Sequence, residues 1–225
     1  MRELIDFLSG FMTDERNSAF DRVLMNRTRY ISVVLEDIYQ AHNASAVLRT
    51  CDCFGIQDVH IIEKRNRYRI SKDVALGAEK WLTINNYHGL TNPTKTVYEQ
   101  LRKSGYRIVA TTPHEGDTSL ENFDPGRGKF ALVFGTELKG LSDEAVSGAD
   151  EFLRIPMFGF TESFNISVSA AIILHYLTKK LHDSDIEWRM DEDEINELKI
   201  RWLRTSIKSS ELLEKQFYAR KGTGN

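Results

Sequence analysis

The sequence predicts an α/β protein built on a parallel sheet that helices flank on both faces. Five short apolar runs, rich in β-branched and aromatic residues, are the candidate strands: residues 31–35 (ISVVL), 59–62, 106–111 (YRIVAT), 130–134 (FALVF) and 152–155. Helices are expected between and after them, at residues 44–54, 97–103, 142–148 and 166–177. Strands that are apolar on both sides are typical of parallel sheets covered on both faces.

Three segments are expected along the chain. Residues 1–28 form a short helical extension, with Leu4, Phe7, Leu8 and Phe11 at helical spacing. Residues 29–182 carry the α/β pattern, and residues 183–225 form a helical tail. A chain of 225 residues is long enough to close one sizeable core around the middle segment.

Composition narrows the class of protein. The longest apolar stretch, residues 168–174, is far shorter than the roughly 20 residues of a membrane span, so we expect a soluble, cytoplasmic protein without a membrane partner. Cys51 and Cys53 are too close for an ordinary disulfide. The six histidines show no close metal-ligand spacing, so no metal is expected.

The net charge of -3 argues mildly against nucleic-acid binding, but its distribution does not. An acidic block at residues 183–197 lowers the net charge without removing local positive charge. Basic residues gather in three clusters: Arg22, Arg27 and Arg29; Lys64, Arg65, Arg67 and Arg69; and Arg201, Arg204, Lys208, Lys215, Arg220 and Lys221. A single basic cluster is more often a solvated surface than a binding site. Three clusters on one small chain make that explanation weaker.

Polar residues follow three of the predicted strands, where ligands of parallel sheets bind. Asn43 is placed to cap the first helix, and Arg49 lies six residues further along. The strand at 130–134 is followed by a glycine loop, residues 135–142 (GTELKGLS), with Ser142 as the next N-cap. After the last strand, residues 161–165 (TESFN) offer more polar side chains than one helix cap requires.

With these loops in view, the chain resembles the SPOUT class of RNA methyltransferases, and within it the TrmH branch of ribose 2'-O-methyltransferases. The matching motifs occur in the family's order: residues 43–50 (NASAVLRT), 134–141 (FGTELKGL) and 155–170 (IPMFGFTESFNISVSA). The resemblance implies a C-terminal deep trefoil knot, an S-adenosylmethionine cofactor and a homodimer. No pattern of hydrophobic periodicity indicates a knot.

The resemblance also implies roles for individual residues. Arg49 matches the arginine proposed as general base; because arginine keeps its proton, clamping a phosphate and stabilising the alkoxide is the safer role. Asn43 and Asn165 would orient Arg49 and the ribose, Glu137 would bridge the loops or the dimer partner, and Ser163 would hold Asn165 or the substrate. Cofactor-binding residues are expected at Thr111 or Thr112, Gly135, Ile155 and Phe164.

The implied substrate is tRNA, with guanosine 18 of the D-loop as the target, because only a short helical segment precedes the α/β part. Basic residues of the tail would contact phosphates, while Trp202 and Phe217 have the spacing of core aromatics and only secondarily of base-stacking groups. Two alternatives stay open: 2'-O-methylation of an rRNA or another tRNA nucleoside, and a noncatalytic RNA-binding factor with the same fold.

Overall fold

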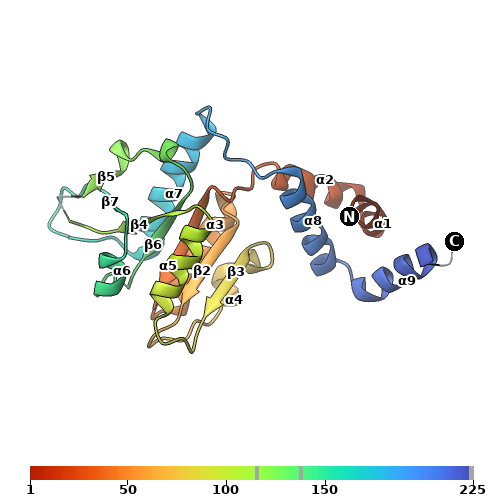
Figure 1. The fold of residues 1–225 in the computed structure, drawn as a ribbon, viewed down its shortest axis with the longest axis horizontal. Coiled ribbons are helices and arrows are strands. Elements are labelled where there is room, and N and C mark those ends of the chain that lie inside the picture. The colour runs from red at the N-terminus through yellow and green to blue at the C-terminus, as the bar shows by residue number, and fades with distance from the viewer. Residues whose placement is uncertain (115–116, 137–138, 223–225) are drawn as a thin grey trace. The chain divides into compact units, whose positions relative to one another are not determined.

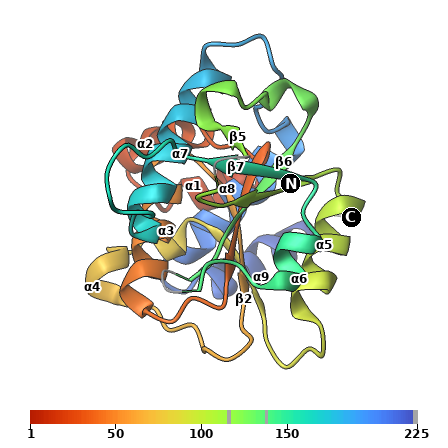
Figure 2. The ribbon, with the colours of Figure 1, turned by 90° about the vertical axis from the view of Figure 1, so that its left-hand side faces the viewer.

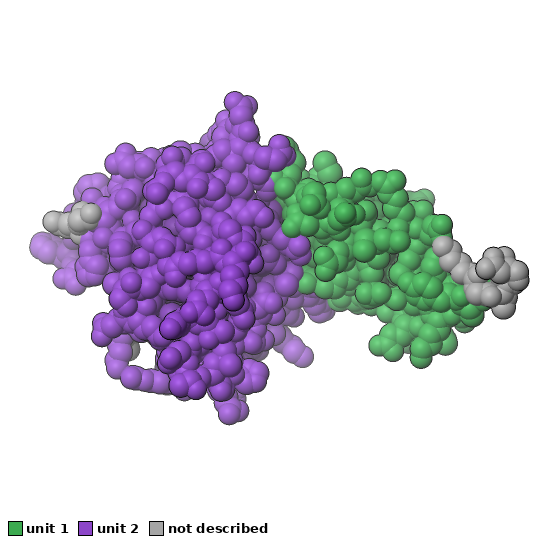
Figure 3. All heavy atoms as spheres, in the orientation of Figure 1, with its two compact units in different colours: residues 1–27, 189–225 green, residues 28–188 purple. Residues whose placement is uncertain are grey.

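The computed structural model of the protein describes residues 1–114, 117–136 and 139–222 (Figure 1). By its internal contacts the chain divides into two compact units, coloured separately in Figure 3. The larger unit is Thr28–Trp188, and the smaller unit combines Met1–Arg27 with Arg189–Asn225. The two ends of the chain therefore belong to the same unit.

The larger unit contains a parallel sheet whose seven described strands lie in the order β3-β2-β1-β6-β4-β7-β5. The strands are β1 (Ile31–Glu36), β2 (Asp58–Ile62), β3 (Thr83–Tyr87), β4 (Arg107–Thr111), β5 (Thr118–Ser119), β6 (Phe130–Phe134) and β7 (Glu151–Arg154). The predicted parallel sheet is confirmed. All seven carboxyl ends lie at one edge of it.

Helices cover both faces of this sheet (Figures 1 and 2). They are α3 (Ala41–Cys53), α4 (Lys72–Ala75), α5 (Pro93–Lys103), α6 (Asp143–Ser147) and α7 (Ile166–His182), with single 3-10 turns at Ala78–Lys80, Leu120–Asn122 and Pro125–Arg127. Val33 and Leu35 of β1 pack with α3 and α7 in one core cluster, whereas Val34 packs with α5 and α6 in another. Successive strand residues point to opposite faces of the sheet. Because helices cover both faces, the residues that point to either face must be apolar.

Two strands of the sheet carry no apolar run and are not predicted from the sequence. β3 (TINNY) is a half-buried edge strand that contains Asn85 and Asn86, and β5 has only two residues. Helix α7 extends five residues beyond the predicted end at Leu177 and reaches His182. None of the helices described here is long and apolar enough to cross a membrane.

The smaller unit consists of four described helices: α1 (Arg2–Ser9), α2 (Asp14–Leu24), α8 (Glu192–Ser206) and α9 (Ser210–Gly222). Trp202 of α8 is buried in its core, where the ring packs edge-on against Phe20 at 5.4 Å and lies 5.2 Å below the Arg27 guanidinium. Asp191 and Glu194 form a capping box that begins α8. Trp202 is thus a core residue and is not available to stack on a base.

Candidate active site

The loops at the carboxyl edge of the sheet enclose a cavity of about 360 Å³ in the larger unit. Its walls come from the segments after β4, β6 and β7 and from the start of α7. The residues predicted to bind a cofactor all line it, together with Ser163: Thr111, Thr112, Gly135, Ile155 and Phe164. A cavity of this size with mixed polar and apolar walls suits a small organic ligand.

Both threonines use their hydroxyl groups within the protein. Thr111 donates to the Val133 carbonyl oxygen at 2.8 Å, which joins the ends of β4 and β6, and Thr112 donates to the Asp117 carboxylate. Any contact of these residues with a ligand is therefore best made by their backbone groups.

Gly135 is required by the packing of its own loop. A Cβ atom at this position would lie 2.3 Å from the carbonyl carbon and oxygen of Gly140 and 2.5 Å from the Leu141 nitrogen. The loop closes on itself through two backbone hydrogen bonds between Thr136 and Gly140, at 2.8 and 2.9 Å, and Gly140 has a positive φ of 66°. These contacts fold the segment so that Gly135, Thr136 and Gly140 all face the cavity.

Asn43 and Asn165 meet although 122 residues separate them: the Asn165 Nδ2 group donates to Asn43 Oδ1 at 3.2 Å. Asn165 also caps α7, because its Oδ1 atom accepts from the Ser167 backbone nitrogen at 2.9 Å. The prediction that Asn43 caps α3 is wrong, since α3 begins at Ala41 with Gln40 as N-cap. Asn43 lies inside the first turn and its side chain reaches toward α7 instead.

The remaining predicted site residues are less constrained. Arg49 is exposed on α3, does not line the cavity, and makes no hydrogen bond or ion pair with the residues that the structure describes. Ser163 is exposed at the cavity wall. Glu137 lies outside the described residues. The structure therefore groups six residues at the cavity and two at the asparagine pair, and leaves Arg49 with its side chain in solvent.

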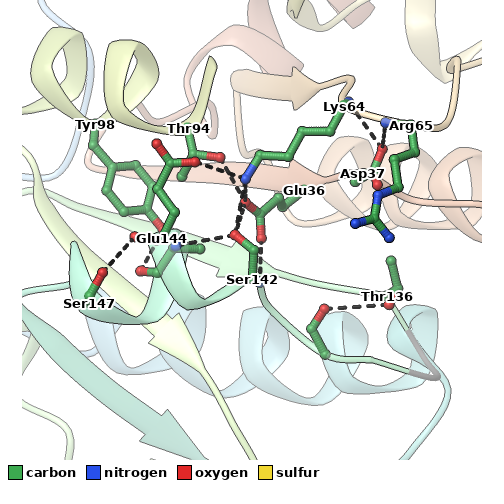
Figure 4. A network of polar contacts seen from close by, with 12 residues as sticks. Glu36, Asp37, Lys64, Arg65, Thr94, Tyr98, Thr136, Ser142, Glu144 and Ser147 are labelled. Atoms are coloured by element: carbon green, nitrogen blue, oxygen red, sulfur yellow. Dashed lines mark hydrogen bonds and ion pairs between the residues drawn. The ribbon is translucent and has the colours of Figure 1, made fainter. Parts of the chain in front are cut away.

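A buried carboxylate that sequence reasoning missed fixes the far end of the glycine loop (Figure 4). Glu36, only 2% exposed, accepts hydrogen bonds from the Ser142 backbone nitrogen at 2.9 Å and from the Thr94 hydroxyl at 2.7 Å. The Ser142 hydroxyl donates to it at 2.7 Å, and the Lys64 ammonium lies 2.8 Å away. Ser142 is also the predicted N-cap of α6, since its hydroxyl accepts from the Ala145 nitrogen.

Glu36, Lys64, Thr94 and Ser142 are called the Glu36 cluster below, and its carboxylate and ammonium groups stay charged at neutral pH. Burial alone would raise the pKa of Glu36, but hydrogen bonds from Lys64, Ser142 and Thr94 outweigh it and lower that pKa. Burial alone would lower the pKa of Lys64, and its bonds to Glu36 and Glu144 raise it. The signal in the sequence was a pair of carboxylates, Glu36 and Asp37, directly after the apolar run ISVVL.

The geometry includes no metal centre: within residues 1–114, 117–136 and 139–222 no three or more histidine, cysteine, aspartate or glutamate side chains are grouped to hold an ion. What it offers is an apolar wall, backbone groups of three loops, and a pair of asparagines beside them. This arrangement can bind and orient a ligand.

The chain belongs to the SpoU rRNA methylase family, whose sequence pattern matches residues 30–175. Among its relatives is the tRNA (guanosine(18)-2'-O)-methyltransferase of Borreliella burgdorferi, which is 41% identical over 210 residues, 93% of this chain and 94% of the relative. The enzyme of the same name from Thermus thermophilus is 29% identical over 85% of this chain and 97% of its own length. The crystal structure of the Aquifex aeolicus TrmH/SpoU tRNA modifying enzyme superposes with a TM-score of 0.75 at 28% identity, covering 87% of this chain and 98% of that one.

Proposed function

We propose that this protein methylates the ribose 2'-hydroxyl of guanosine 18 in tRNA, with S-adenosylmethionine as the methyl donor. The observation that carries the proposal is the 41% identity to the tRNA (guanosine(18)-2'-O)-methyltransferase of Borreliella burgdorferi along nearly the full length of both chains. The cavity at the carboxyl edge of the sheet supports it, because its lining includes every residue that the family resemblance assigns to the cofactor.

The cavity is suited to an adenosyl group. Ile155, Phe134 and Phe164 provide apolar surface for a purine, and the loops of Gly135 and Thr112 bring backbone donors and acceptors beside it. S-adenosylmethionine supplies a methyl group on a positively charged sulfur, which is already a strong electrophile. The protein then has to align the ribose hydroxyl with that methyl group, which lowers the barrier by several kcal/mol. It also has to favour transfer of the hydroxyl proton to an RNA phosphate or to water.

Arg49 is the group we assign to the second task. Its guanidinium carries a positive charge at all accessible pH values, so it stabilises the developing alkoxide and binds a neighbouring phosphate. Asn43 and Asn165 hold each other at the start of α7 and orient the ribose. Ser163 contacts the substrate from the cavity wall, and Glu137 links the glycine loop to a neighbouring segment or to a second subunit.

Four further properties belong to the proposal. The chain between β7 and α7 passes through a trefoil knot, as the family resemblance implies. The protein acts as a homodimer: Phe158, Phe160, Phe164 and Val168 are exposed by 98%, 108%, 41% and 43% around that loop, a density of apolar surface expected where a second subunit packs. It works in the cytoplasm. Residues 29–182 are the catalytic domain, and residues 1–28 and 183–225 assist RNA binding.

The test is methyl transfer from labelled S-adenosylmethionine to total tRNA, followed by nucleoside mapping. We expect the label on 2'-O-methylguanosine at position 18. Label on a different nucleoside, or on rRNA alone, would replace the substrate assignment. Binding of RNA without any transfer would instead favour a noncatalytic RNA-binding protein.

A further inference from the structure

The loop that follows β2 presents a row of arginines to solvent. We name residues 64–71 (KRNRYRIS) the arginine loop. Arg65, Arg67 and Arg69 are exposed, whereas Asn66 and Tyr68 between them are half-buried. Alternate side chains therefore face outward, and all three of these are guanidinium groups.

The beginning of the arginine loop is fixed by one carboxylate. Asp37 Oδ1 accepts hydrogen bonds from three consecutive backbone nitrogens, those of Lys64 at 3.0 Å, Arg65 at 2.7 Å and Asn66 at 2.8 Å. The Asn66 side chain donates in return to the Asp37 carbonyl oxygen at 2.9 Å. Asp37 has a positive φ of 54°, a conformation that most non-glycine residues avoid and that aspartate tolerates.

Two more contacts hold the rest of the arginine loop. The Tyr68 nitrogen donates to Glu63 Oε1 at 3.2 Å, and the Ser71 nitrogen donates to Ser45 Oγ at 2.9 Å. Ser45 belongs to α3, two residues after Asn43. The loop is thus fixed against the helix that also carries Asn43 of the asparagine pair, so a partner that binds the arginines does not have to order a long free segment.

The three outward arginines have no anionic partner among the described residues, whereas the adjacent Lys64 does. Lys64 is bound to Glu36 and Glu144. In Figure 4 the Arg65 backbone nitrogen is bonded to Asp37, while no hydrogen bond or ion pair is drawn to its guanidinium. In the tail, Arg204 is bound through two nitrogens to the Glu214 carboxylate at 2.7 and 2.8 Å. The arginine loop therefore carries three unneutralised charges on a backbone that hydrogen bonds hold in place.

The position of the arginine loop relates it to the cavity. β2 is parallel to β1, β6, β4 and β7, so the loop after β2 and the cavity loops after β4, β6 and β7 lie at the same edge of the sheet. A polyanion whose modified nucleoside is bound at that edge would bring its flanking phosphates past these arginines. Guanidinium groups bind phosphate oxygens in a fork geometry.

We propose that Arg65, Arg67 and Arg69 bind phosphate groups of the RNA substrate beside the modified nucleoside. This inference rests on the proposed function, because it takes tRNA as the polyanion. The contacts position the RNA and do not read its bases. The same loop would accordingly bind tRNAs of different sequence alike.

The experiment compares two triple variants of the full-length protein that lose the same charge. One is Arg65→Ala/Arg67→Ala/Arg69→Ala, and the matched control is Lys103→Ala/Arg127→Ala/Lys129→Ala, whose residues precede β4 and β6 at the opposite edge of the sheet. The affinity for a tRNA transcript is measured at several salt concentrations. Removing one phosphate-binding side chain should flatten the dependence of log K on log salt by about 1. We expect a slope flatter by about 2–3 in the arginine-loop variant and the wild-type slope in the control.

Two further measurements make the result specific. The affinity for S-adenosylmethionine should match the wild type in both variants, which shows that the cavity is intact. Arg65→Lys/Arg67→Lys/Arg69→Lys should recover most of the slope, since the charges return. An arginine-loop variant with an unchanged slope, or a control whose slope flattens as much, would overturn the inference. If the wild-type protein methylates no tRNA at all, it is the proposed function that has failed.

Discussion

The Glu36 cluster offers the most direct test of how the glycine loop is held. In Glu36→Gln an amide replaces the carboxylate at the same volume. In the wild type the Ser142 nitrogen donates to Glu36 Oε2, and an NH2 group at that position could not accept this hydrogen bond. Lys64 would also lose its buried counter-charge. A hydrogen bond to a charged group contributes about 1.5–3 kcal/mol, and breaking a buried ion pair costs about 3–5 kcal/mol. Because Lys64 keeps Glu144, we expect a loss of about 2–4 kcal/mol in the free energy of unfolding.

The assay is urea unfolding followed by circular dichroism, with all variants compared at the same protein concentration, because the stability of the proposed homodimer would depend on that concentration. Glu99→Gln is the matched control: Glu99 is exposed and its oxygen lies 4.0 Å from Lys95, so the change should stay within about 0.5 kcal/mol. A double-mutant cycle with Lys64→Met should show a coupling of at least about 1 kcal/mol. No coupling, or equal losses in Glu36→Gln and the control, would refute the assigned role.

The pH dependence of this difference has a definite sign. The pKa of Glu36 is lowered in the folded protein, so its ionised form stabilises the fold fully above the pKa of an unfolded glutamate, about 4.3. That contribution is lost as the pH falls further, through the lower folded value. The gap between wild type and Glu36→Gln should therefore be widest near neutral pH and should shrink on acidification below about pH 4.

Three more predictions concern Gly135, Arg49 and His60. Gly135→Ala should weaken S-adenosylmethionine binding at least about tenfold by calorimetry, because the new Cβ atom would lie 2.3 Å from the Gly140 backbone. Gly159→Ala is the control, because a Cβ atom there would have no other atom within 4 Å. Wild-type affinity in Gly135→Ala would contradict the packing argument. Arg49→Ala should abolish methyl transfer while cofactor affinity stays close to wild type; equal loss of both would mean that Arg49 is misplaced. Burial lowers the pKa of His60 to about 4, so the folded state resists its protonation and the unfolding free energy should fall by about 3 kcal/mol between pH 6.5 and pH 4. His60→Asn should remove that part of the pH dependence of the unfolding free energy. A variant with the same pH dependence as the wild type would contradict the role assigned to His60.

The strands predicted from the sequence were those with a continuous apolar run, because burial on both faces leaves a clear signal. β6 (FALVF) is buried throughout and occupies the predicted residues. β3 escaped prediction because an edge strand needs only partial burial, and TINNY carries two asparagines. The parallel sheet flanked by helices is therefore confirmed, whereas its two outermost strands, β3 and β5, could be identified only from the structure.

Contacts between distant segments were the least predictable. Local rules placed Asn43 at a helix cap, but its side chain is bonded to Asn165, which no local pattern indicates. Glu36 was overlooked because its partners, Thr94 and Ser142, lie 58 and 106 residues away along the chain. The packing of α1 with α8 and α9 also joins the two ends of the sequence, whose helical spacing alone gave two separate extensions.

The central claim is that a ribose hydroxyl at position 18 of tRNA accepts the methyl group. The measurement that tests it most directly uses two transcripts of one tRNA, identical except that guanosine 18 is replaced by 2'-deoxyguanosine in the second. With labelled S-adenosylmethionine, we expect close to one methyl group per molecule on the first transcript and none on the second. Equal labelling of both transcripts would place the methyl group elsewhere and contradict the account.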